Sequence, residues 1–145
     1  MFRKLRESDY SVFHTLINEF RKTTFSEEQF LLTLSNIQKS GDIWVYQEID
    51  GSLVAVATIY YEYKFIFNTC VLAHIEDVCV SESQRGKGYG KKLMNKLYEE
   101  ARAHGCYKIT LDCADHNVGF YEACRLTKRG NQMCELIENL FTKEA

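Results

Sequence analysis

Residues 73–91 read AHIEDVCVSESQRGKGYGK, and this stretch decides the fold. Its first half, up to Val80, is rich in β-branched residues and is typical of a strand. Glycines then occupy positions 86, 88 and 90, directly before a sequence with helical periodicity. Such glycines leave backbone N–H groups uncovered where a helix begins, so the amides, the helix dipole and two lysines can hold an anion. The stretch predicts a strand, an anion-binding turn and a helix in succession.

The spacing of these glycines excludes two familiar nucleotide motifs. A Walker loop has its second glycine five positions after the first, followed by Lys and Ser or Thr, whereas the fifth position after Gly86 is Lys91, followed by Lys92. A dinucleotide fingerprint has its third glycine three positions after the second, whereas Gly90 follows Gly88 by two. The turn is therefore expected to bind a different phosphate-containing ligand.

Length and composition predict one compact domain, residues 1–145. The chain is 46% hydrophobic, so it can form one core, and its formal net charge of −2 comes without a block of like charge. This balance excludes a basic nucleic-acid-binding face. The N-terminus lacks the apolar stretch of a secretion signal, and no run of about 18 apolar residues is present, so we expect a cytoplasmic protein without a membrane span. Six scattered cysteines without a C-x-x-C pair are expected to be free thiols, with no metal.

The periodicity predicts a mixed α/β protein in the order β-α-α-β-β-β-α-β-α-β. Ser26 and Gln29 are spaced as a capping box, Asp50-Gly51 is typical of a hairpin turn, and Gly105 can end a helix. A strand reached through a helix is expected to run parallel to the previous one. Strands are expected at 2–6, 43–49, 53–63, 70–80, 108–113 and 133–137, and helices after Ser8 or Asp9, at 26–40, before Gly105 and at 117–124.

The pattern Arg85-x-x-Gly88-x-Gly90 resembles the pyrophosphate loop of the acetyl-CoA-dependent N-acetyltransferases of the GNAT superfamily. The segments 74–78, 105–113 and 117–122 resemble one branch, the glucosamine 6-phosphate N-acetyltransferases. The resemblance is dense from Lys64 to Tyr121 and fades beyond Cys124. It implies the GNAT fold and direct acetyl transfer, in a ternary complex, from acetyl-CoA to the amine of glucosamine 6-phosphate, which gives N-acetylglucosamine 6-phosphate and CoA for UDP-N-acetylglucosamine synthesis. It also implies a homodimer that shares its active sites and swaps the final strand.

The resemblance assigns the acetyl-CoA contacts to three segments. The main chain at the end of the central strand is expected to pair with the pantetheine arm, the glycine turn to hold the pyrophosphate, and the later short helix to supply further contacts. These residues are Val78, Cys79, Val80, Arg85, Gly86, Lys87, Gly88, Tyr89, Gly90, Lys91, Asn117, Tyr121, Glu122 and Ala123.

The same resemblance assigns the chemistry to Tyr121, Glu76 and Asp112. Tyr121 is expected to protonate the departing thiolate, and the two carboxylates to orient the amine and help to remove its proton. Asp77 points away from Glu76 in a regular strand, yet the family uses both, so the strand is expected to contain a bulge. His74 lacks a second ligand at metal spacing, and we assign it no role. The implied acceptor contacts are Thr23, Lys64, Phe65, Ile66, Phe67, Glu76, Asp77, Tyr107, Lys108 and Asp112.

Three departures from the family pattern leave the acceptor open. Phe67 replaces a loop histidine, Arg125-Leu126 replaces Gly-Phe after the Tyr121 helix, and Glu135-Leu136 stands where an arginine would reach the phosphate. The helix must then end without glycine. A GNAT enzyme for another small amine and a non-catalytic acyl-CoA-binding module stay as alternatives.

Overall fold

The computed structural model describes residues 1–142, and the chain divides into two compact units, up to Leu111 and from Asp112 on. The single domain expected from the sequence stays a prediction. The first unit contains β1 (Phe2–Lys4), η1 (Glu7–Asp9), α1 (Tyr10–Phe20), α2 (Glu27–Gln38), β2 (Gly41–Gln47), β3 (Leu53–Tyr63), α3 (Ile66–Thr69), β4 (Val71–Val80), η2 (Glu82–Gln84), α4 (Tyr89–Ala103) and β5 (Lys108–Leu111). The second contains η3 (Asp115–Asn117), α5 (Val118–Ala123) and α6 (Ile137–Leu140).

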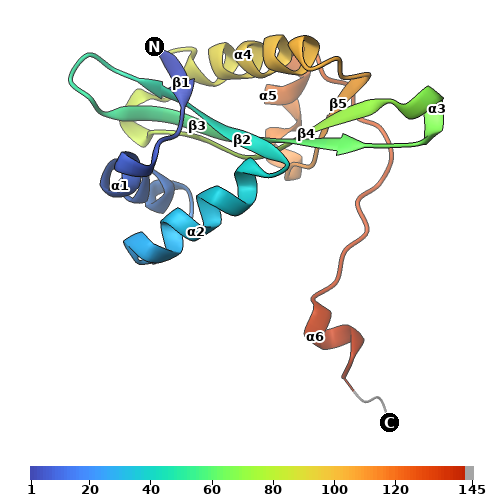
Figure 1. Ribbon diagram of the computed structural model, residues 1–145. Helices are drawn as coiled ribbons and strands as arrows, with labels where there is room; N and C mark the ends of the chain where they lie inside the picture. The colour runs from blue at the N-terminus through green and yellow to red at the C-terminus, as the bar shows by residue number, and fades with distance from the viewer. Residues whose placement is uncertain (143–145) are drawn as a thin grey trace. The chain divides into compact units, whose positions relative to one another are not determined.

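The first unit is built on one sheet with the strand order β1-β2-β3-β4-β5. Its first three pairings are antiparallel, and β4 pairs with β5 in parallel, as expected for strands joined through a helix. Helices α1 and α2 cover one face of the sheet, and α4 covers the other (Figure 1). The expected mixed α/β class is confirmed.

Alternating side chains supply a core on each face of this sheet. Between the sheet and the α1–α2 pair, Leu16, Phe30, Val45, Val56 and Cys79 belong to one buried cluster. On the α4 side, the three apolar side chains of one helix face are completely buried; they are Leu93, Met94 and Leu97. The spacing of these three residues is that of an amphipathic helix, which explains why α4 forms at this position.

The capping box of α2 is confirmed. The Gln29 N–H donates to the Ser26 hydroxyl oxygen at 3.1 Å, and the Gln29 side chain accepts from the Ser26 N–H at 2.8 Å. Phe25 lies against Phe30 with ring centroids 6.3 Å apart, which is the contact of a hydrophobic staple. The start of α2 is therefore fixed by local sequence.

The expected strand at 133–137 is wrong for the single chain. Residues 133–136 have no regular structure, and α6 begins at Ile137. A strand needs a neighbour to pair its backbone groups, and the described residues of the second unit contain no strand. Within residues 1–142, no helix has the length and apolar character needed to cross a membrane.

Candidate functional site

A β-bulge in β4 sets the directions of the candidate carboxylates. The register passes from Val56↔Cys79 to Thr58↔Glu76, so β4 has one more residue than β3 between these pairs. Asp77 occupies the bulge with a φ of 53°, a left-handed conformation that is uncommon for a non-glycine residue. The bulge places Glu76 and Cys79 on the same face, together with α1 and α2, whereas a regular strand would place them on opposite faces. The predicted irregularity is confirmed.

The end of β4 has a free edge. Pairing between β4 and β5 ends at Ile75↔Leu111, although β4 continues to Val80. Across residues 76–80, the first unit therefore offers main-chain groups with no strand on the β5 side. Such an edge can pair with an extended ligand in the manner of an added strand. Burial raises the pKa of the Cys79 thiol to about 11, which keeps it protonated at neutral pH.

The glycine turn forms an open set of amides before α4. Gly86 and Gly88 have φ values of 80° and 88°, and a Cβ built on either would meet no atom within 4 Å. The Lys92 N–H donates to the Gly88 carbonyl at 3.1 Å and is the first amide of this helix bonded to the preceding turn. The Arg85 Nε donates to the Val80 carbonyl at 3.2 Å, which joins the turn to the end of β4. This geometry is suited to an anion at the positive end of the helix dipole.

Glu76 belongs to a hydrogen-bonded chain of three side chains. His74 Nε2 lies 2.8 Å from Glu76 Oε1, and His74 Nδ1 lies 2.9 Å from the Thr110 hydroxyl on β5. His74 and Thr110 are also register partners. Sequence reasoning missed both residues, although the two-residue step from Glu76 to His74 along one strand could have indicated that the two share a face.

Charged groups near the bulge perturb one another. Burial raises the pKa of Asp77, and the negative charge of Glu76 raises it further against an opposing effect of Arg21. Burial, followed by the charges of Asp77 and Glu76, raises the pKa of Tyr60 on the neighbouring strand. Asp77 is consequently a carboxylate that an amine or ammonium group would stabilise in its ionised form.

A cavity of about 270 Å³ lies between the α1–α2 pair and the sheet. Two of the predicted acceptor residues, Thr23 and Asp77, line it. Most of the remaining lining is apolar and comes from Phe13, Ile17, Phe25, Phe30, Leu34, Ile37, Ile43 and Val56. This cavity combines an apolar wall with one carboxylate.

The β3–β4 connection contains four predicted acceptor residues, 64–67, and ends in a left-handed turn. Phe67, Asn68 and Thr69 all have positive φ values, and the Phe67 ring stacks on Tyr107 at 5.2 Å. Lys64 is paired with Glu62 at 3.1 Å, while Phe65 and Ile66 are exposed. Lys108 lies two residues before Thr110 on β5, so both are on the face that carries His74.

The second unit carries the remaining predicted residues. Asp112 directly follows β5 in the chain and accepts a hydrogen bond from Gln132 at 3.2 Å. Asn117 precedes α5, whose residues include Tyr121, Glu122 and Ala123, and the Tyr121 ring lies 4.9 Å from that of Phe120. Helix α5 ends at a left-handed Arg125, with a φ of 72°, which confirms that this helix ends without glycine.

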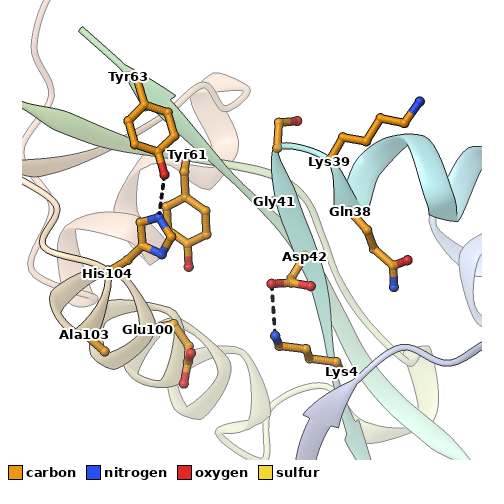
Figure 2. Close-up of a pocket in the computed structure, with 11 residues that line it drawn as sticks. Lys4, Gln38, Lys39, Gly41, Asp42, Tyr61, Tyr63, Glu100, Ala103 and His104 are labelled. Atoms are coloured by element: carbon orange, nitrogen blue, oxygen red, sulfur yellow. Dashed lines mark hydrogen bonds and ion pairs between the residues drawn. The ribbon is translucent and has the colours of Figure 1, made fainter.

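A second cavity, of about 350 Å³, lies beside the C-terminal end of α4 and contains no predicted site residue. Figure 2 shows Tyr61 and Tyr63 beside His104, with Asp42 across the cavity. The Tyr61 and His104 rings stack at 3.7 Å, and Lys4 pairs with Asp42 at 3.3 Å. Burial and nearby negative groups raise the pKa of Tyr61 to about 12. Its charged groups have both signs, so this cavity indicates no particular ligand.

Comparison with known proteins relates the chain to one family. The profile of the acetyltransferase (GNAT) family matches residues 5–125. A Dictyostelium discoideum protein named glucosamine 6-phosphate N-acetyltransferase 1 is 33% identical, over 91% of this chain and 87% of its own. An Arabidopsis thaliana enzyme of that name is 34% identical, over 94% and 95%.

Solved structures give the same relationship. The crystal structure of glucosamine-6-phosphate N-acetyltransferase from Arabidopsis thaliana matches with a TM-score of 0.88 at 33% identity, covering 94% of this chain and 97% of the other. A Trypanosoma brucei acetyltransferase matches with the same TM-score at 29% identity, covering 94% and 99%. These matches extend over the residues that form the bulge, the free edge and the glycine turn.

Proposed function

The chain belongs to the acetyltransferase (GNAT) family, and from this premise we propose that it transfers the acetyl group of acetyl-CoA to the amine of glucosamine 6-phosphate. The observation that carries the proposal is the bulge at Asp77, which places two carboxylates, those of Glu76 and Asp77, at the start of the free main-chain edge of β4. The names and coverage of the Dictyostelium and Arabidopsis relatives support the choice of acceptor. We place the reaction in the cytoplasm, as a step toward UDP-N-acetylglucosamine.

In this proposal, the first unit binds acetyl-CoA along β4 and the following turn. Main-chain groups of residues 78–80 pair with the pantetheine arm, and one N–H polarises the thioester carbonyl. The amides and cations of residues 85–91 hold the pyrophosphate. Asn117 and residues 121–123 of the second unit add contacts to the same ligand.

The chemical step needs no nucleophile from the protein. The neutral amine of the acceptor attacks the thioester carbon, a C–N bond forms, the C–S bond breaks, and CoA leaves as a thiolate. The protein positions the reactants, and Glu76 and Asp112 orient the amine and accept its proton. Tyr121 donates a proton to the thiolate.

The role of Tyr121 is tested by replacing its hydroxyl group. Because a proton donor acts in the transition state, Tyr121→Phe should lower kcat by about tenfold to a hundredfold and leave acetyl-CoA affinity nearly unchanged. Steady-state kinetics with cofactor titration measure both quantities. Unchanged turnover would show that the ring serves only packing.

The acceptor phosphate is assigned to Lys64, Tyr107 and Lys108, with Phe65, Ile66, Phe67 and Thr23 shaping the rest of the acceptor site. Lysines supply point charges, and Tyr107 supplies a hydroxyl donor. The Lys64 pairing with Glu62 must open or be shared for Lys64 to serve in this way. Lys108 needs no such change, because no ion pair engages it within the described residues.

We assign the active form to a homodimer with shared sites. The described part of the segment after Gly130, up to residue 142, forms no strand and exposes large apolar side chains; they are Met133, Leu136, Ile137, Leu140 and Phe141. A second copy can cover these side chains and complete the strand pairing.

The decisive experiment measures thiol release from acetyl-CoA with glucosamine 6-phosphate, with glucosamine, and without acceptor. We expect rapid release only with the phosphorylated amine. Turnover of glucosamine alone would overturn the assigned acceptor. Acetyl-CoA binding without thiol release for any amine would instead indicate a non-catalytic binding module.

A different amine is a second candidate acceptor, favoured by the cavity beneath α1 and α2. Its apolar wall and the single carboxylate of Asp77 suit an amine with a hydrocarbon or aryl group better than a sugar phosphate. Parallel assays with 2-phenylethylamine separate the two acceptors. A higher kcat/KM for phenylethylamine than for glucosamine 6-phosphate would favour this second function.

A further inference from the structure

We propose that His74, held by Thr110, is a positioning residue that fixes the Glu76 carboxylate for the acceptor amine. The inference rests on the proposed acetyl transfer, in which Glu76 orients the amine. It assigns a role to two residues that are not part of the acceptor or acetyl-CoA contacts given above.

The hydrogen-bond chain has a defined direction. An ionised Glu76 can only accept a hydrogen bond, so the His74 Nε2, at 2.8 Å, must carry the proton that it donates. In the neutral imidazole, Nδ1 is then an acceptor, and the Thr110 hydroxyl, at 2.9 Å, donates to it. The network thus selects one tautomer, with Nε2 protonated.

The backbone holds all three side chains in place. His74 and Glu76 are two residues apart on β4, and Thr110 is the register partner of His74 on β5, so the three lie on one face of the sheet. The pairing of β4 with β5 ends one residue after His74, at Ile75↔Leu111. Glu76 is therefore the first residue beyond the segment of β4 that has a register partner on β5.

The Glu76 carboxylate needs a hydrogen bond from another side chain to hold it in one position. Its side chain is 43% exposed, whereas that of His74 is 29% exposed. The next residue, Asp77, is also a carboxylic acid and, when ionised, has no hydrogen-bond donor that could hold Glu76 in place. The bond from His74 occupies Oε1 and leaves Oε2 for the acceptor. Because a misplacement of about 1 Å can cost a hundredfold in rate, such support acts mainly on kcat.

Two variants at His74 test which of its ring nitrogens is needed for activity. In His74→Gln the side-chain amide extends to the position of Nε2 and can still donate to Glu76, whereas in His74→Asn it ends near Nδ1. We expect His74→Asn to lower kcat about tenfold to a hundredfold, with little change in KM for acetyl-CoA. His74→Gln should keep most of the wild-type kcat. Thr110→Val should give a smaller loss that Thr110→Ser rescues. Equal loss in His74→Gln and His74→Asn would overturn the proposal.

A double-mutant cycle tests whether His74 acts through Glu76. In a Glu76→Gln background, His74→Asn should cause little further loss of kcat, because the group it positions is already replaced. Additive losses would mean that His74 has an independent role and would contradict the proposal. Thermal unfolding of each variant identifies any loss that arises from misfolding.

A spectroscopic measurement keeps this inference separate from the proposed reaction. ¹⁵N NMR of the ring nitrogens in the free protein should show Nε2 protonated and Nδ1 unprotonated, with this preference weakened in Thr110→Val. The opposite tautomer would overturn the inference, even in an active enzyme. If the wild type fails to acetylate glucosamine 6-phosphate while the tautomer is as expected, the proposed function fails and the hydrogen-bond chain stands.

Discussion

Arg125 has an unfavourable, left-handed backbone conformation at the end of α5. The Leu126 N–H donates to the Tyr121 carbonyl and the Arg125 N–H to the Glu122 carbonyl, which is the Schellman pattern, and it requires the left-handed φ of 72° at Arg125. A side chain there costs about 1 kcal/mol relative to glycine. We expect Arg125→Gly to be more stable than Arg125→Ala by about that amount.

Comparing these two variants isolates the backbone, since both remove the arginine side chain and its contacts. Urea unfolding monitored by circular dichroism measures the difference. Equal stability of the glycine and alanine variants would show that the left-handed residue carries no strain in solution.

Some features of single residues could be predicted from the sequence, and others could not. The bulge at Asp77 and the glycine-free end of α5 were both predicted from the family resemblance, because the family uses both Glu76 and Asp77 and has Gly-Phe where this chain has Arg125-Leu126. The His74–Thr110 contact was not, since it depends on the register between β4 and β5, which a sequence does not specify in advance.

At the scale of elements, the two ends of α4 provide a matched pair of glycines. Gly88 and Gly105 lie at opposite ends of this helix, with φ values of 88° and 77°, and an added Cβ meets no atom within 4 Å at either. Alanine at either position should therefore cost a similar amount of stability, about 1 to 2 kcal/mol. Only at Gly88 would the methyl group enter the space proposed for the pyrophosphate.

We expect Gly88→Ala to weaken acetyl-CoA binding at least tenfold relative to Gly105→Ala. Isothermal titration of the two variants measures the difference at equal folded fraction. Equal affinities would remove this turn from the cofactor site, whatever the stability of the variants.

A buried ion pair joins β1 to the start of α1. Arg3 Nη1 lies 2.8 Å from Asp9 Oδ2, and both residues are almost completely buried. Burial acts to raise the pKa of Asp9, but hydrogen bonds from the Arg3 guanidinium and the Arg6 N–H, with the charge of Arg3, lower it overall. Because the folded pKa is depressed, this stabilisation is complete above the unfolded pKa of about 4 and is lost as the pH falls through the folded value.

Asp9→Asn should lower the free energy of unfolding by about 3 kcal/mol at pH 7, because it leaves the Arg3 charge buried without a partner. The difference in free energy of unfolding between Asp9→Asn and the wild type should become smaller below about pH 4, where the wild-type carboxylate is itself being protonated. Denaturant unfolding at several pH values measures this difference. Glu62→Gln, which removes an exposed pair with Lys64, serves as the control and should change stability little. A pH-independent difference would contradict the assigned role of the charge.

Most elements of the first unit were predictable because their signals are local. The capping box of α2, the Asp50-Gly51 turn and the apolar face of α4 each lie within one helix or hairpin. The segment 133–137 shows why the rest was not. Its apolar residues on either side of Glu135 were interpreted as a strand, but pairing requires a neighbour, and the described second unit supplies none.

At the scale of the whole molecule, the same segment predicts a dimer whose disruption removes activity. Leu136 is 61% exposed in the single chain and is one of the residues, 133–137, expected to pair with a second copy. Leu136→Asp places a charge in that contact, which is costly to bury without a partner. Sedimentation velocity should therefore show a dimer for the wild type and a monomer for Leu136→Asp at micromolar concentration.

Ile49→Asp is the matched control, because Ile49 is a fully exposed apolar residue beside the β2–β3 turn, and its replacement should leave a dimer. If the two copies share their active sites, acetyl transfer should fall together with dimerisation and recover as the concentration of Leu136→Asp is raised. A Leu136→Asp monomer with wild-type kcat would show that each chain holds a complete site. In that case the exposed apolar side chains after Gly130 would need a different explanation from shared catalysis.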